Sequence, residues 1–104
     1  MDVEAVRAEV GSWDGVEASS AGELRYDGRL LGRVGAGGAE IAFHPGIARM
    51  LVETGRAEPH GEPGLVRFAG ETGEAIELFR LAYERARVAA RVRRTATRPG
   101  SDPA

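Results

Sequence analysis

The fold of this chain is decided by one eight-residue stretch, Leu24-Arg25-Tyr26-Asp27-Gly28-Arg29-Leu30-Leu31. Its central Asp27-Gly28 dipeptide accepts the positive φ angles of a type I′ turn, which joins two antiparallel strands through a two-residue loop. Such a turn would place Leu24 opposite Leu31. Because two leucines adjoin at the end of the stretch, the pattern leaves open which of them faces the core. The stretch predicts a β-hairpin, and with it an antiparallel sheet.

The segments that follow the hairpin extend this sheet. Residues 35–38 contain three glycines and predict a turn, and residues 40–43 predict the next strand. Residues 56–64 contain two prolines and two glycines, so they are predicted to form a loop. Residues 65–68 then predict one more short strand.

Two short helices are predicted on either side of the hairpin region. Residues 2–10 place valines at helical spacing, with Asp2 as N-cap and Gly11 at the end. The second helix is predicted to begin at Pro45, because a proline at the first helical position loses no hydrogen bond. Gly55 is placed to end it, and its predicted apolar stripe consists of Ile47, Met50 and Leu51.

The clearest helix is predicted to begin near Glu71 and to end near Arg94. Its apolar residues recur at steps of three and four: Ala75, Leu78, Phe79, Ala82, Tyr83, Ala86 and Ala90. Residues 95–104 have the composition of a disordered tail. The predicted order is helix-strand-strand-strand-helix-strand-helix. It indicates one α+β domain over residues 1–94, a small antiparallel sheet with the helices packed on one face.

Composition and charge exclude several classes of protein. The chain contains no cysteine, which removes disulfides, thiolate nucleophiles and cysteine–zinc sites. Its first residues lack the pattern of a secretory signal, and no window approaches the roughly 18 apolar residues of a membrane span. We therefore expect a cytoplasmic location and no membrane partner. The net charge is −7 over residues 1–84 and +5 over residues 85–104. This arginine-rich end has no interleaved aromatic residues, so we do not expect nucleic acid as a partner.

The two histidines are the best candidates for chemistry. His60 has a carboxylate two residues away on either side, Glu58 and Glu62, and these could orient its imidazole. His60 is therefore the predicted general base of any catalytic site. The spacing of the histidines matches no metal signature, so no metal is expected, and the sequence does not identify a cofactor. Four further residues are predicted to bind a ligand near His60: His44, Glu58, Arg33 and Tyr26.

Four segments resemble the luciferase-like domain shared by fungal bioluminescence luciferases and small uncharacterised bacterial proteins. They are Trp13-Asp14-Gly15-Val16, Gly28-Arg29-Leu30-Leu31-Gly32, Gly55-Arg56-Ala57-Glu58-Pro59-His60 and Glu74-Ala75-Ile76-Glu77-Leu78-Phe79-Arg80-Leu81-Ala82-Tyr83-Glu84-Arg85. The resemblance covers roughly residues 6–87 and implies an α+β domain. The family pattern has histidines where this chain has Arg33 and Gly35, and a second histidine after the one that matches His60. Of those groups only His60 is present here, so light-emitting oxygenation is not expected.

Three functions are compatible with these features. The favoured one is a small-molecule binding or accessory domain that uses the sheet face near His60. The second is an enzyme that acts on a small organic substrate, with His60 as general base. The third is an interaction module that pairs through the C-terminal helix or a sheet edge, including a homo-oligomer. Three apolar residues of that helix lie outside its main stripe and favour the third: Ile76, Leu81 and Val88.

Overall fold

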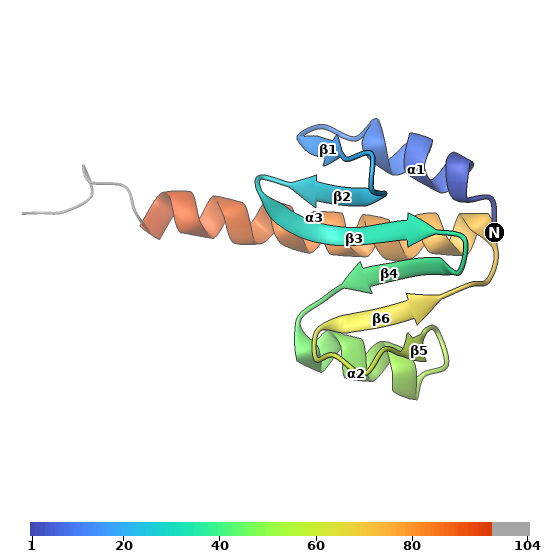
Figure 1. The fold of residues 1–104 in the computed structure, drawn as a ribbon. Helices are drawn as coiled ribbons and strands as arrows, with labels where there is room; N and C mark the ends of the chain where they lie inside the picture. The colour runs from blue at the N-terminus through green and yellow to red at the C-terminus, as the bar shows by residue number, and fades with distance from the viewer. Residues whose placement is uncertain (97–104) are drawn as a thin grey trace, which may run out of the picture.

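The computed structural model describes residues 1–96, which fold into three helices and one six-stranded sheet (Figure 1). The helices are α1 (Val3–Gly11), α2 (Pro45–Glu53) and α3 (Thr72–Ala96). The strands are β1 (Val16–Ala18), β2 (Glu23–Tyr26), β3 (Arg29–Gly35), β4 (Gly38–Ala42), β5 (Glu58–Pro59) and β6 (Leu65–Phe68). They lie in the order β1-β2-β3-β4-β6-β5, and all neighbouring strands are antiparallel. The predicted α+β class is confirmed.

The predicted hairpin between β2 and β3 is present, but its register differs from the prediction. Asp27 and Gly28 form the turn with φ angles of 53° and 78°. Leu24 lies opposite Gly32 rather than Leu31, because Leu31 is the extra residue of a β-bulge. The bulge turns the side chain of Leu31 to the same face as that of Leu24, and both are almost completely buried. The bulge therefore decides which of the two adjacent leucines enters the core.

Two short strands were not predicted. β1 pairs with β2 at one edge of the sheet, and β5 pairs with β6 at the other. β5 lies inside residues 56–64, which were predicted to be a loop. Strands of three and two residues are too short to show alternation, and they form because a neighbouring strand offers its edge.

The core lies between the sheet and the helices. α3 runs behind β3 in Figure 1 and packs against β2, β3 and β4, while α1 lies against α3. α2 packs against β5 and β6. One cluster of buried apolar side chains includes residues from all three helices and from the sheet. The helices thus cover one face of the sheet, as predicted.

Most of the predicted helix boundaries hold, with one error in an apolar stripe. The side chain of Asp2 accepts a hydrogen bond from the Ala5 N–H at 3.1 Å and caps α1 as predicted. In α2, Met50 was predicted to face the core, but it is 48% exposed. Ala48 and Leu51 are the buried residues of that helix, because the sheet lies on the side that these two residues face.

The C-terminal helix α3 is longer than predicted. α3 continues to Ala96, two residues past the predicted end at Arg94. The rest of the predicted tail, residues 97–104, lies outside the described residues. Within residues 1–96, no helix combines the length and the apolar character that crossing a membrane requires.

Gly32 lets α3 approach the sheet closely. A Cβ at this position would lie 2.8 Å from Cε1 of Phe79 and would also collide with the backbone carbonyl of Glu40. The Phe79 ring is fully buried, so it occupies the space that a side chain at Gly32 would need. The contact fixes the distance between α3 and the centre of the sheet.

We expect Gly32→Ala to lower the free energy of unfolding by about 2 kcal/mol or more, because neither the carbonyl nor the packed ring can yield easily. Urea unfolding measures the change. Gly35→Ala is the matched control in the same strand, since nothing lies within 4 Å of its added Cβ, and it should change the stability by less than about 0.5 kcal/mol. Equal stability of the two variants would contradict the close approach of Phe79.

Candidate functional site

The face of the sheet turned away from the helices carries a row of charged side chains. Paired residues of neighbouring strands point to the same face, so the strand register places these side chains in line. Their charges alternate in sign from strand to strand across the sheet: Glu23 on β2, Arg33 on β3, Glu40 on β4, Arg67 on β6 and Glu58 on β5. We call this face the open face.

Glu40 makes two polar contacts on the open face, an ion pair with Arg33 and a hydrogen bond with His60. Its Oε1 lies 3.5 Å from Nε of Arg33, and its Oε2 lies 2.7 Å from Nε2 of His60. His60 directly follows β5, so its side chain reaches over β6 to meet a residue of β4. The carboxylate of Glu40 is therefore held from both sides.

The bond to Glu40 decides which nitrogen of His60 carries the proton. An ionised carboxylate can only accept hydrogen bonds, so Nε2–H of His60 donates to it. In the neutral ring, Nδ1 is then the basic nitrogen. It is buried and has no hydrogen-bond partner within residues 1–96. The side chain as a whole is 12% exposed, so a molecule in solvent does not reach Nδ1 in this conformation.

A hollow of about 530 Å³ lies on the open face, and we call it the open-face hollow; Glu40 lines it, whereas His60 does not. Four charged residues line it: Arg33, Glu40, Glu58 and Arg67. Arg33 and Glu40 are paired with each other. In the part of the chain that the structure describes, the side chains of Arg67 and Glu58 make no hydrogen bond or ion pair. The hollow thus offers one unpaired cation and one unpaired anion.

The structure brings three of the predicted site residues to the open face, namely His60, Arg33 and Glu58. The carboxylate bonded to His60 is Glu40, however, and not one of its neighbours in sequence, Glu58 and Glu62. The sequence interpretation therefore named the wrong acidic partner. It also missed Arg67, because only the pairing of β6 with β4 and β5 brings this side chain beside the others.

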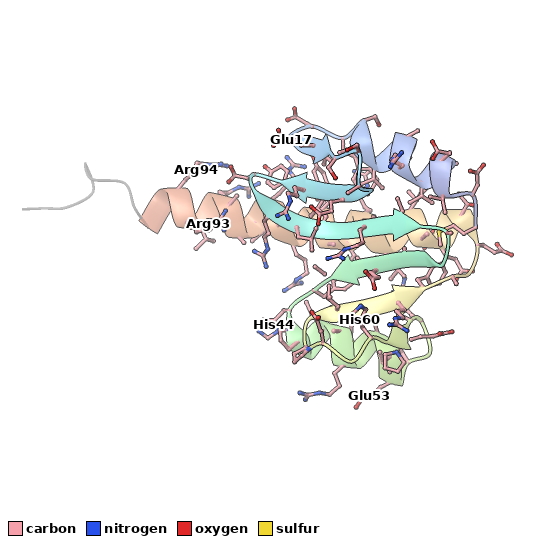
Figure 2. All side chains as sticks on the ribbon, in the orientation of Figure 1. Glu17, His44, Glu53, His60, Arg93 and Arg94 are labelled. Atoms are coloured by element: carbon pink, nitrogen blue, oxygen red, sulfur yellow. The ribbon has the colours of Figure 1, made fainter. Side chains whose placement is uncertain are left out.

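The other two predicted ligand-binding residues lie elsewhere. His44 caps α2, because its Nδ1 accepts a hydrogen bond from the Gly46 N–H at 3.1 Å. Figure 2 shows His44 at the start of α2 and His60 against β6. Tyr26 packs edge-on against Tyr83 of α3 at a ring distance of 5.4 Å, so it lies on the helix-covered face. Neither residue lines the open-face hollow.

Within residues 1–96, no group of three or more histidine and acidic side chains is arranged to hold a metal ion. Comparison of the chain with protein-family models, with curated proteins and with solved structures finds no match. The resemblance to the luciferase-like domain therefore stays a prediction.

We expect the His60–Glu40 bond to contribute about 1 kcal/mol of coupling energy, because the histidine is largely shielded from water. A double-mutant cycle of His60→Ala and Glu40→Ala, with stabilities measured by urea unfolding, gives the coupling energy of this pair separately from the contribution of the Arg33–Glu40 contact. The Glu23–Arg25 pair is the control. Its carboxylate is as exposed as that of Glu40 but its arginine is 44% exposed, so its coupling should stay below about 0.5 kcal/mol. Equal coupling energies in the two pairs would contradict the claim that the shielding of His60 from water strengthens its bond to Glu40.

Proposed function

We propose that this chain is a small-molecule-binding domain of the cytoplasm whose ligand lies in the open-face hollow, next to Glu40, the hydrogen-bond partner of His60. The observation that carries the proposal is the pair of unpartnered charges, Arg67 and Glu58, on adjacent strands in that hollow. A volume of about 530 Å³ falls within the range of roughly 300–1,000 Å³ that small-molecule sites occupy.

The charges of the hollow favour a small zwitterion, such as a free amino acid. A carboxylate of the ligand would receive two parallel N–H bonds from the planar guanidinium of Arg67. An ammonium group of the ligand would pair with Glu58. Arg33 is already ion-paired with Glu40, and Glu40 is bonded to His60, so these residues are less available to a ligand than Arg67 and Glu58. In this proposal His60 is a positioning residue.

Catalysis by His60 has less support than binding. A general base needs its free nitrogen within hydrogen-bond reach of the proton that it removes. The nitrogen of His60 that points away from Glu40 is buried. An enzyme built on this residue would first have to expose Nδ1.

We expect amino acids to cause saturable chemical-shift changes at Arg67 and its strand neighbours in an NMR titration. Arg67→Gln should weaken this binding at least about tenfold, because the ligand carboxylate loses a charge-assisted pair. Arg25→Gln is the matched control, since Arg25 is a charged residue of β2 outside the hollow, and it should leave the affinity unchanged.

The proposal fails if no amino acid gives saturable shifts. It also fails if Arg25→Gln weakens binding as much as Arg67→Gln, because the effect would then reflect net charge alone.

A second function, self-association through α3, is favoured by two exposed apolar residues. Val88 and Val92 are 54% and 60% exposed and lie one turn apart on one side of the helix, in line with the half-buried Leu81. Figure 1 shows this end of α3 running past the turn between β2 and β3. We propose that two copies pair their α3 helices antiparallel. The acidic first turns of one helix, with Glu74 and Glu77, would then meet the arginine-rich end of the other.

We expect the apparent mass of the wild type in sedimentation equilibrium to rise with protein concentration. Val88→Glu should shift it towards the monomer, because a carboxylate would have to enter the apolar contact. Met50→Glu is the control on α2, with a residue of similar exposure, and should behave as the wild type. A wild type that stays monomeric at every concentration would rule out the self-association.

A further inference from the structure

We infer that the chain carries a second binding site, for a small organic carboxylate with an apolar body, on the opposite side of the sheet from the open-face hollow. The site is a hollow of about 240 Å³ between α3 and the adjoining ends of β3 and β4, and we call it the helix-side hollow. Its lining includes Arg29 and Leu31 of β3, Phe43 and His44 beyond β4, and Arg85 and Ala86 of α3.

The floor of the helix-side hollow is apolar and buried. Leu31, Phe43 and Ala86 are at most 8% exposed. α3 presents alanines here on successive turns, Ala82, Ala86 and Ala89, with Arg85 and Val88 beside them. Larger side chains at the alanine positions would fill the space, so their small size keeps the hollow open. An apolar group that enters it is removed from water on several sides.

The rim of the helix-side hollow is cationic. Arg29 and Arg85 come from opposite walls, one from the sheet and one from α3. Within residues 1–96, neither side chain makes a hydrogen bond or an ion pair. Among the described residues, no acidic side chain lines this hollow, in contrast to the open-face hollow with its two carboxylates. The charge of the rim therefore favours an anion.

His44 adds a hydrogen-bond donor to the same rim. Its Nδ1 accepts the bond that caps α2, so the neutral ring carries its proton on Nε2. The rim thus offers two guanidinium groups and one imidazole N–H. All three are hydrogen-bond donors, and a carboxylate accepts hydrogen bonds. The capping bond fixes the proton of His44 on Nε2, and Nε2–H can then donate to a ligand, in line with the predicted ligand-binding role of His44.

The size of the helix-side hollow limits its ligand. Its volume of about 240 Å³ lies below the roughly 300 Å³ of the smaller typical sites. A single ring or a short aliphatic chain with one carboxylate fits this space and this charge pattern. A dinucleotide is too large for this space.

Benzoate is the probe that tests this site, with benzamide as its neutral counterpart of nearly the same shape. In an NMR titration of the full chain, we expect benzoate to cause saturable shifts at Phe43 and Ala86. We expect benzamide to bind at least about tenfold more weakly, because it lacks the charge that the rim attracts. The titration is run at a dilution at which the wild type is monomeric, since Arg85 and Val88 lie on the same side of α3 as the proposed self-association.

Three variants test whether benzoate binds in the helix-side hollow. The double variant Arg29→Gln with Arg85→Gln should weaken benzoate binding at least about tenfold, and Ala89→Phe should abolish it by filling the space. Arg49→Gln is the matched control, because this residue is an exposed arginine of another helix. It should leave the affinity unchanged. Dispersed amide spectra confirm that each variant is folded, and the two arginine changes are at exposed positions, so the test does not depend on Ala89→Phe alone.

The inference is overturned by any of three results: no saturable shift, equal binding of benzoate and benzamide, or equal loss in the Arg49→Gln control. Benzoate-induced chemical-shift changes that centre on Arg67 would also overturn it, since they would place the anion in the open-face hollow. Arg67→Gln should leave benzoate binding intact, so this site and the proposed amino-acid site can fail independently.

Discussion

Phe79 of α3 packs directly on the backbone of β3 at Gly32, where even a methyl group would collide with its ring. This contact brings the longest helix close to the middle of the sheet. Gly32 is opposite Leu24 on one side and Ile41 on the other, and both side chains are fully buried. The β-bulge next to Gly32 turns a further leucine into the same layer. The core, and therefore the division of the sheet into a covered and an open face, depends on this close approach.

The two faces of the sheet differ in chemistry because of that division. On the open face the charged side chains of the strands stay at least partly in water, so charges of alternating sign face each other across the strands at little cost. Glu40 becomes a shared partner there, between an arginine and a histidine. On the covered face, charged side chains are confined to the rim, as Arg29 and Arg85 are at the helix-side hollow. The first arrangement favours a zwitterion, and the second favours an anion with an apolar body.

The candidate site was only partly predictable from local sequence. His60 could be selected as a histidine in a predicted loop, Glu58 as the carboxylate two residues before it, and Arg33 as a position where the resembled family has a histidine. The pairing of His60 with Glu40 could not, since the two residues are 20 positions apart and meet only because β6 lies between β4 and β5. Arg67 was missed for the same reason. His44 was selected for its residue type, yet its position before Pro45 also made it a helix cap.

The sequence by itself determined the class of the fold and most of its elements. The Asp27-Gly28 turn, the apolar spacing of α3 and the proline that opens α2 act through neighbours in the chain, and local patterns report such effects. Tertiary structure alone decided the bulge at Leu31, the short edge strands and the hydrogen bond between His60 and Glu40. Each of these depends on which strand lies beside which, and that choice is made by packing the whole core at once.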